Sequence, residues 1–281
     1  MLTLHCRQYV NPMQNQDITE GFQHVDQSQT GFLVKFLEDV HRCETVQEGF
    51  AKQLGWLNIQ PGDHILDVGC GIGDQAYAMA KLTGKTGSVT GTDISNTMIA
   101  TAQHRHAAHG LPLSFVVAPA AQQLFAGASF DIIRTERVLM YLKNIDEVFT
   151  EYNRLMKPGG KLLIFDIDWD ALVLPHPDKN LTRRIVEFIS DSFPSGRIGA
   201  ELYGHFKDFG FKDIQIRPHG YMHNLELTKR IIGGITFTGV ANNIFTSEEI
   251  TNWWAALEKA DAEGKFFSCF QGFMVIGEKG E

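Results

Sequence analysis

The sequence predicts an α/β fold in which helices cover both faces of a mostly parallel β-sheet. Between residues 64 and 167, short apolar runs alternate with helix-like patterns. The apolar runs are continuous, which is typical of strands that are buried on both faces in parallel sheets. The chain has 281 residues, so one large domain with a cap can bury a sizeable core.

The first part of the chain is expected to form a helical cap segment. Residues 1–29 are polar and irregular, whereas apolar residues recur at helical spacing in Phe32–Val40 and in Val46–Leu57. A turn at Pro61–Asp63 follows. We therefore divide the chain into a cap segment, residues 1–50, and a main domain, residues 51–281, with cap insertions at residues 168–200 and 220–263.

The main domain is expected to alternate between strands and helices, with turn or capping residues at the boundaries. The expected strands are His64–Val68, Ser88–Thr92, Leu113–Val117, Phe130–Arg134, Lys161–Ile167, Lys212–Pro218 and Lys265–Gly277. The expected helices are Asp74–Leu82, Ser95–His109, Ile145–Met156, Asp178–Ser192, Ala200–Phe209, Glu226–Val240 and Ser247–Ala262.

Composition restricts the partners and the compartment. The net charge is −8 and there is no basic run, which disfavours nucleic acid and anionic membranes as partners. The four cysteines show no CxxC spacing, and His104, His106 and His109 do not share a helix face. We therefore expect solvated histidines, no metal site and a reducing compartment. Without a signal peptide or membrane-spanning run, the expected protein is cytoplasmic, as a monomer or homodimer.

The strongest local feature is a glycine-rich turn, LDVGCGIGD, between Leu66 and Asp74. A buried strand runs into three alternating glycines, and a helix follows. Glycine is needed where φ is positive or where a ligand approaches the backbone closely. The following helix offers free N–H groups and the positive end of its dipole, so the turn predicts a nucleotide-like ligand.

Two kinds of ligand fit this turn. Gly71–Ala76 can be spelled as the GxGxxA of a dinucleotide loop. However, Asp74 stands where a pyrophosphate would lie, and two negative groups repel each other. Asp67, at the end of the strand, can instead bind the ammonium group of a methionine moiety. Asp93, at the end of the next strand, can reach ribose hydroxyls in either ligand.

The motifs LDVGCGIGD, GTDIS, FDIIRTERVLMYL and LMKPGGKLLIFDID, taken in this order, resemble class I S-adenosylmethionine-dependent methyltransferases. They are similar in style to the ubiquinone/menaquinone-biosynthesis methyltransferases. The resemblance covers residues 54–168. It implies a Rossmann-like, doubly wound, seven-stranded sheet with a helical cap from the N-terminus and C-terminal insertions.

The resemblance also implies a set of cofactor-binding residues. These residues are expected to contact the methionine end, the ribose or the adenine of the cofactor, and the last four of them belong to the end of the fourth strand and the turn after it. They are Asp67, Gly69, Gly71, Gly73, Gln75, Asp93, Ile94, Met98, Ala120, Ala121, Thr135, Glu136, Arg137 and Val138. Relatives often carry an Asp after the third strand, where this chain has Pro119. The adenine is therefore expected to be held by backbone groups and apolar packing. Glu136 and Arg137 have a surface ion pair as an alternative role.

No catalytic motif is expected, because methyl transfer depends mainly on placing the acceptor in line and excluding water. Weak catalytic candidates at the strand ends are Tyr141, Asp168 and His176, with Trp169 and Asp170 beside them. Each has an alternative role in packing, in capping or as a solvated side chain. Aromatic residues outside the motifs suggest a lid over an organic acceptor, or ordinary core: Phe22, Phe32, Phe36, Phe188, Phe193, Tyr203, Trp253, Trp254, Phe266 and Phe267.

The leading hypothesis is methyl transfer from S-adenosylmethionine to oxygen, nitrogen or carbon of a small metabolite, with S-adenosylhomocysteine as product. Two alternatives stay open. One is an NAD(P)-dependent oxidoreductase, and the other is a non-catalytic S-adenosylmethionine-binding protein. Mobile N-terminal lids commonly close over ligands, so we also predict that residues 1–30 become ordered on binding.

Overall fold

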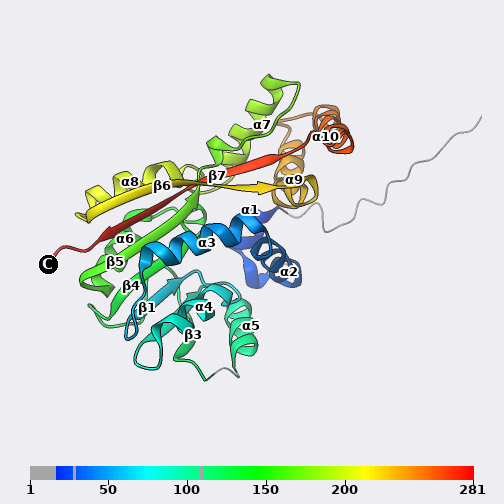
Figure 1. Ribbon diagram of the computed structural model, residues 1–281. Helices are drawn as coiled ribbons and strands as arrows, with labels where there is room; N and C mark the ends of the chain where they lie inside the picture. The colour runs from blue at the N-terminus through cyan, green and yellow to red at the C-terminus, as the bar shows by residue number, and fades with distance from the viewer. Residues whose placement is uncertain (1–16, 28–29, 108–109) are drawn as a thin grey trace, which may run out of the picture.

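The computed structural model describes residues 17–27, 30–107 and 110–281. A seven-stranded sheet with the order β3-β2-β1-β4-β5-β7-β6 forms its centre (Figure 1). β7 is antiparallel to both neighbours, and the other strands are parallel to one another. This confirms the predicted fold class. The strands are β1 (His64–Val68), β2 (Ser88–Asp93), β3 (Leu113–Val117), β4 (Phe130–Glu136), β5 (Met156–Ile167), β6 (Lys212–His223) and β7 (Ser268–Glu278).

Helices cover both faces of the sheet. Neighbouring residues of β1 illustrate this: Ile65 packs with Leu57 and Met79 on one face, and Leu66 packs with Phe149 on the other. The first face is covered by α3 (Glu44–Leu57), α4 (Asp74–Thr83) and α5 (Asn96–His106), and the second by α6 (Ile145–Leu155) and α8 (Ile198–Asp208). The order of strands reverses between β1 and β4, which is where open α/β sheets bind ligands.

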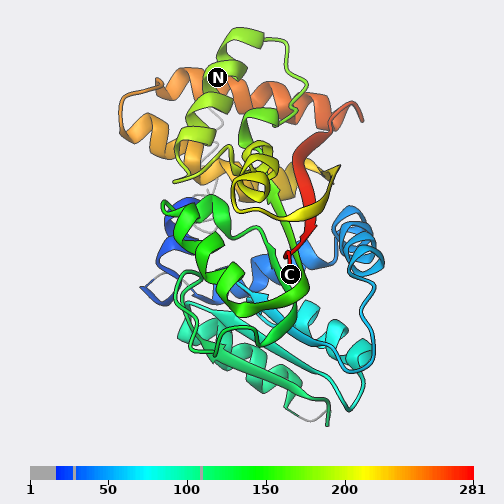
Figure 2. The ribbon, with the colours of Figure 1, turned by 90° about the vertical axis from the view of Figure 1, so that its left-hand side faces the viewer.

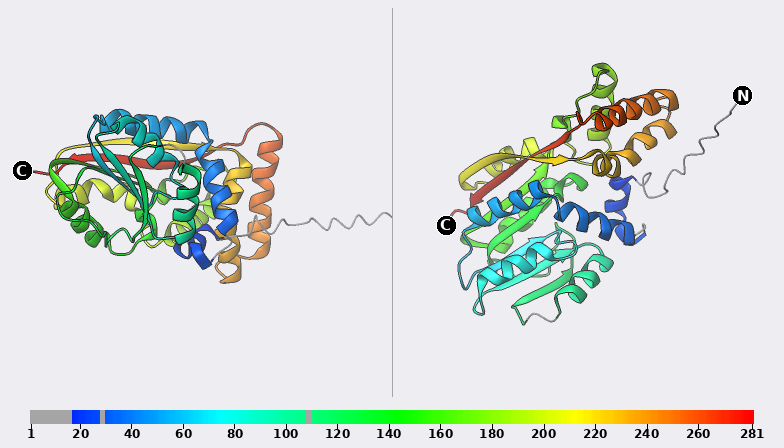
Figure 3. Two further views of the ribbon diagram at one scale, coloured as in Figure 1. Left: turned by 90° about the horizontal axis from the view of Figure 1, so that it is seen from below. Right: turned by 45° about the vertical axis from the view of Figure 1, so that its right-hand side comes forward.

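A helical cap lies at one end of the sheet. Its C-terminal part is α7 (Lys179–Asp191), α9 (Leu225–Ala241) and α10 (Ser247–Ala262), which contact one another and gather above the sheet in Figure 2. Its N-terminal part is α1 (Ile18–Gln23), the 3₁₀ turn η2 (Val25–Gln27) and α2 (Thr30–His41). Figure 3 shows this blue segment between the cyan half of the sheet and the orange cap helices.

Two expectations about the elements were wrong. Residues 18–27 are not irregular, because α1 and η2 gain order by burying Ile18 and Val25 against the rest of the chain. β6 does not end at Pro218 but continues to His223, because it pairs with β7 as far as His223 opposite Ser268. The proposed boundary at residue 50 lies inside α3. Residues 1–16 and 28–29, which belong to the segment expected to become ordered on binding, lie outside the described residues.

None of the helices in residues 17–27, 30–107 and 110–281 combines the length and apolarity that crossing a bilayer requires.

Candidate functional site

A cavity of about 500 Å³ opens where β1, β2 and β4 end, and its size is typical of small-molecule sites. One side, called here the glycine-turn wall, consists of residues at the ends of β1 and β2 and in the turns and helix starts that follow β1, β2, β3 and β4. They are Val68, Gly69, Cys70, Gly71, Gln75, Asp93, Ile94, Met98, residues 118–121 and Val138. Phe22 and Phe36, from α1 and α2, also line the cavity, so the N-terminal helices form part of its enclosure.

The glycine turn has the backbone conformation that its sequence requires. φ is positive at Gly69, Gly71 and Gly73, a region that side-chain-bearing residues rarely adopt. A Cβ atom on Gly69 would overlap the side chain of Val138, which follows β4. The missing side chain therefore lets the turn after β1 and the turn after β4 meet beside the cavity.

Asp93 holds the glycine turn against β2. Its carboxylate accepts the backbone N–H of Gly71 at 3.0 Å and that of Ser95 at 2.9 Å. Asp26 of η2 lies next to it, where it accepts the Ser95 hydroxyl at 2.5 Å and the Thr97 N–H at 3.1 Å. These hydrogen bonds lower the pKa of Asp26. The N-terminal segment is thereby fixed to the start of α5, beside Asp93.

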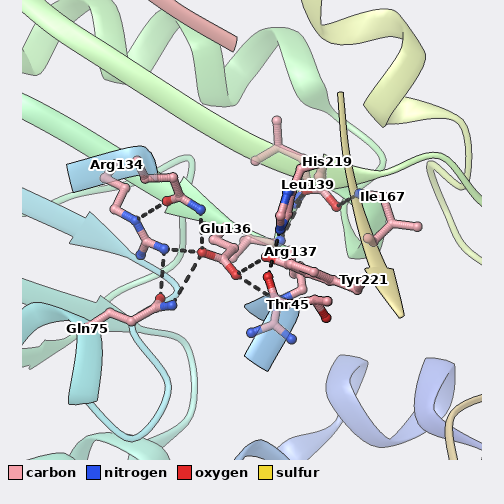
Figure 4. A network of polar contacts seen from close by, with 12 residues as sticks. Thr45, Gln75, Arg134, Glu136, Arg137, Leu139, Ile167, His219 and Tyr221 are labelled. Carbon is pink, nitrogen blue, oxygen red and sulfur yellow. Dashed lines mark hydrogen bonds and ion pairs between the residues drawn. The ribbon is translucent and has the colours of Figure 1, made fainter. Parts of the chain in front are cut away.

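A buried polar network lies beneath the cavity (Figure 4). Its centre is Arg134 of β4, whose side chain is 2% exposed. The guanidinium donates to Asp67 at 2.7 Å, to Gln53 at 2.8 Å and to Gln75 at 2.7 Å, and it is also ion-paired with Glu136. Asp67 is thus already paired on one oxygen. Its other oxygen, Oδ2, is buried without a hydrogen-bond partner among the described residues.

Glu136 connects this network to the cavity. It is 7% exposed and lines the cavity, and it accepts the Tyr221 hydroxyl at 2.9 Å and the amide of Gln53 at 2.9 Å. Burial alone would raise its pKa, but Arg134 and Arg137 together with these hydrogen bonds lower the pKa to about 2. Glu136 is therefore a fully paired anion. The alternative of a surface ion pair is wrong for this residue, because it is buried.

A second side of the cavity, called here the aromatic wall, consists of Phe22, Tyr141, Trp169, Tyr221, His223 and Phe270. Its rings follow one another through short contacts. Phe22 lies 5.5 Å from Tyr141, Trp169 lies 5.5 Å from Phe270, and Phe270 lies 5.0 Å from His223, between ring centroids. Such a surface suits an organic molecule with an apolar body.

His223 is the last residue of β6 and a polar member of this wall. It is 7% exposed, and its Nδ1 atom is buried with no hydrogen bond of normal geometry to the described residues. Burial and, after it, the charge of Arg137 lower its pKa to about 4. The imidazole is therefore neutral at physiological pH and retains hydrogen-bonding capacity toward the cavity.

The structure places most of the sequence-predicted cofactor residues on this cavity. Those that line it are Gly69, Gly71, Gln75, Asp93, Ile94, Met98, Ala120, Ala121, Glu136, Arg137 and Val138, whereas Asp67, Gly73 and Thr135 lie behind it. Pro119 also lines the cavity.

Of the catalytic candidates, Tyr141 and Trp169 line the cavity, and Asp168, Asp170 and His176 are not among the lining residues. Asp168 caps the 3₁₀ turn η4 (Trp169–Ala171) by accepting the N–H of Asp170. His176 stacks on Trp253 with ring centroids 5.4 Å apart. These two side chains thus have structural partners away from the cavity.

The aromatic residues that suggested a lid or ordinary core divide between the two roles. Of these ten residues, Phe22 and Phe36 line the cavity, whereas Trp253, Trp254 and Phe193 are ordinary core. His106 is not solvated either, because its ring stacks on Tyr77 at 4.7 Å. Within the described residues no His, Cys, Asp and Glu side chains group as a metal site; His109 lies outside them.

Sequence reasoning missed Tyr221, His223 and Phe270. One signal was available, because His219, Tyr221 and His223 occupy alternate positions and therefore share a face of one strand. It was overlooked because the strand was expected to end at Pro218.

Comparisons with known proteins agree with this geometry. Residues 59–203 match the family described as "Methyltransferase domain". The 2-phytyl-1,4-naphtoquinone methyltransferase of Synechocystis is 36% identical over 119 residues, 41% of this chain and 50% of that protein. The ubiquinone/menaquinone biosynthesis C-methyltransferase UbiE of Laribacter hongkongensis is 34% identical over 121 residues, 42% of this chain and 50% of that protein. This chain thus spans about half the length of these curated relatives.

A solved structure shows the same fold. Phosphoethanolamine N-methyltransferase 2 of Haemonchus contortus, in complex with S-adenosyl-L-methionine, superposes with a TM-score of 0.58 at 19% identity, covering 95% of this chain and 60% of that one. The family match covers more than half of the chain and includes the glycine turn, Asp93 and the turn after β4. The chain therefore belongs to the methyltransferase domain family.

Proposed function

We propose that this chain binds S-adenosylmethionine along the glycine-turn wall and transfers its methyl group to a small organic molecule held against the aromatic wall. The observation that carries the proposal is the single cavity that both walls share. A methyl transferase needs two ligands in contact with each other and shielded from water.

The residues present fit this cofactor. The buried Oδ2 of Asp67 has no hydrogen-bond partner in the described part of the chain, but Asp67 lies behind the cavity lining. The methionine end would therefore contact Gly69, Gly71 and Gln75, which line the cavity in front of it. Asp93, on the cavity, is positioned for the ribose hydroxyls, with Ile94 and Met98 for the adenine. The adenine end has no carboxylate after β3, so backbone groups and packing at residues 118–121 are left to hold it.

When bound, S-adenosylmethionine supplies an electrophilic methyl group on a sulfonium. The chain itself contributes position and exclusion of water. Asp93 and the closely packed backbone of the glycine turn position one ligand, the aromatic wall positions the other, and α1 and α2 enclose both. Glu136 keeps its charge paired with Arg134 and Arg137, so it holds the site in place rather than accepting a proton.

The acceptor is proposed to be a small molecule rather than a nucleic acid, because the net charge of −8 would repel phosphates. The names of the relatives support an organic acceptor, since one is a naphthoquinone methyltransferase and another a ubiquinone/menaquinone C-methyltransferase. A cytoplasmic location and a monomeric or homodimeric state remain predictions, as does the division into a cap segment and a main domain at residue 50.

Calorimetric titration with S-adenosylhomocysteine tests the cofactor. Asp93→Ala should weaken its binding by about 1–3 kcal/mol, as for a lost charged hydrogen-bond partner. The matched control is Asp131→Ala, which removes a carboxylate from the amino end of β4, where it pairs with Lys157. This control should leave the affinity unchanged. Binding of NADH without any binding of S-adenosylhomocysteine would contradict the proposal.

A second experiment separates an enzyme from a binding protein. The chain, incubated with methyl-labelled S-adenosylmethionine and metabolite pools, should transfer label to a small molecule. Label recovered in no product, despite tight S-adenosylhomocysteine binding, would favour a non-catalytic role.

A further inference from the structure

Three polar side chains with unused hydrogen-bonding capacity gather at one end of the cavity. They are Arg137, which follows β4, Tyr141 of the 3₁₀ turn η3 (Leu139–Tyr141), and His223 at the end of β6. Arg137 lies over the ring of Tyr221 at 5.8 Å. The ring of Tyr221 lies 6.4 Å from that of His223, between centroids, and the N–H of Tyr141 donates to the carbonyl of Val138, the residue after Arg137.

Each of these groups can still donate a hydrogen bond. Arg137 is 17% exposed and contacts Glu136 through Nε at 3.2 Å, while its terminal nitrogens have no hydrogen-bond partner among the described residues. The Tyr141 hydroxyl likewise has none there, and the Nδ1 atom of His223 makes no hydrogen bond of normal geometry to the described residues. The neighbouring polar pair, Glu136 and Tyr221, is by contrast closed on itself by a 2.9 Å hydrogen bond.

The balance of charge at this end favours an anion. Glu136 is already shared by Arg134, Arg137, Gln53 and Tyr221, so it has little capacity left for a cationic ligand. Arg137 presents its guanidinium nitrogens, which bind oxygen anions in a planar fork. An ammonium group placed here would meet this positive charge and find no free carboxylate.

We propose that the methyl acceptor carries an anionic oxygen on an aromatic body, with the oxygen bound by Arg137 between Tyr141 and His223 and the ring packed on the aromatic wall. The inference rests on the proposed function and names its class of acceptor. A phenol-type or enol-type hydroxyl that ionises on binding, or a carboxylate, supplies this chemistry.

An ionised acceptor needs no catalytic base. The hydroxyl proton leaves to solvent when the oxygen is bound by Arg137. The acceptor oxygen then forms a C–O bond to the methyl carbon while the C–S bond breaks and its electron pair returns to sulfur. His223 stays neutral throughout and donates an N–H, and Tyr141 donates its O–H.

Arg137 could alternatively bind the carboxylate of the cofactor's methionine. Its surroundings favour the acceptor, because Arg137 lies 5.8 Å from the ring of Tyr221, which belongs to β6 together with His223. Asp67 and the glycine turn belong to β1 and the loop after it. The experiment below distinguishes the two roles.

Three probes share one ring and differ in charge: 4-nitrophenol, 4-nitrobenzoate and 4-nitrobenzylamine. Each is titrated into the full chain saturated with S-adenosylhomocysteine, whose own binding is measured first and tests the proposed function separately. We expect the phenol or the benzoate to bind about 10-fold or more tightly than the amine, as for a charge-assisted hydrogen bond. The visible absorbance of 4-nitrophenolate should show bound phenol ionising about one pH unit lower than in solution.

Variants of the chain then test whether Arg137 causes the preference for anionic probes. Arg137→Gln should abolish both the preference for anions and the shift in ionisation, and Arg137→Lys should keep part of each. Arg197→Gln, which removes an exposed arginine paired with Asp170, is the matched control and should change neither. Melting temperatures and S-adenosylhomocysteine affinity check that each variant is folded.

The probe titrations also distinguish the two kinds of anionic acceptor. Binding of ionised 4-nitrophenol indicates an acceptor hydroxyl, and binding of 4-nitrobenzoate alone indicates an acceptor carboxylate. Equal binding of the amine, an anion preference that survives Arg137→Gln, or no binding of any probe to the S-adenosylhomocysteine complex would each overturn the inference. So would Arg137→Gln weakening S-adenosylhomocysteine itself by 10-fold while the probe ratios stay unchanged, since that result assigns Arg137 to the cofactor.

Discussion

The glycine-turn wall comes from residues that are close together in the sequence, whereas the aromatic wall is assembled from elements far apart in the chain. Gly69, Gly71 and Asp93 belong to a single β1-α4-β2 unit. Tyr141, His223 and Phe270 come from η3, β6 and β7. The form of a local turn depends on a few neighbouring residues, whereas a wall built from distant elements depends on how the whole chain folds.

The two walls also differ in their electrostatics. Beneath the glycine-turn wall, the charges of Arg134, Asp67 and Glu136 are paired and buried. On the side of the aromatic wall, Arg137 and His223 retain donors that no described residue satisfies. The first arrangement holds a structure in place, and the second is available to a ligand. The following predictions, from the largest expected effect to the smallest, test this difference.

The largest loss is expected for Arg134→Met, which removes the cation at the centre of the buried network. Asp67 and Glu136 would remain buried without their partner, so the free energy of unfolding should fall by about 3–5 kcal/mol. Urea denaturation measures it. Arg154→Met, which breaks an exposed pair with Glu151, is the control and should cost at most about 1 kcal/mol. If Arg134→Met lowered the free energy of unfolding by no more than the control does, the buried network would not stabilise the glycine-turn wall.

A somewhat smaller loss is expected for Gly69→Ala. The new methyl group would overlap Val138 at a positive φ, and strain and overpacking together should cost about 2–4 kcal/mol. S-adenosylhomocysteine affinity should fall as well. Gly69→Ala combined with Val138→Ala should recover the steric part of the loss but not the part due to φ.

Gly55→Ala is the matched control for the Gly69→Ala variants. Gly55 lies in α3 with open space around its Cα atom, so alanine should stabilise the helix by about 0.5–1 kcal/mol. A Gly69→Ala protein as stable as the wild type would contradict the close approach of the two turns.

The smallest effect concerns pH and His223. Its pKa is about 6.5 in the unfolded chain and about 4 when folded, so the unfolded state binds more protons between these values. Stability should therefore fall as the pH decreases from 6.5 to 4, by about 2–3 kcal/mol from this residue. His223→Phe should lose that part of the pH dependence.

Urea titrations at pH 7 and pH 4.5 measure the difference between wild type and variant. His104→Phe, at an exposed histidine of α5, serves as the control and should keep the wild-type slope. An unchanged slope in His223→Phe would show that this imidazole is not held neutral by its surroundings.

The sequence was sufficient wherever a property depended on neighbouring residues. The alternating strands and helices predicted the sheet, and the glycines at 69, 71 and 73 predicted a turn with positive φ, as observed. The resemblance assigned fourteen cofactor residues, of which eleven line the cavity. Each of these inferences needs only the order of residue types along the chain.

Arg134 shows where such reasoning stops. In the sequence it is a charged residue within an apolar strand, and nothing nearby in the chain identifies its partners. Gln53 of α3, Asp67 of β1 and Gln75 of α4 come together only in the folded sheet. The pairing of Asp67 with Arg134 was therefore not predictable from the motif alone.

By itself, then, the sequence determined the fold class, the glycine turn and the position of Asp93, because these follow from local spacing and backbone preference. Tertiary structure decided the aromatic wall, the pairing of Glu136 and the unpaired donors of Arg137 and His223. The physical reason is that burial and charge pairing depend on which distant elements meet. β6 reaches the cavity because it pairs with β7 along its full length, and that pairing carries His223 to the side of Arg137.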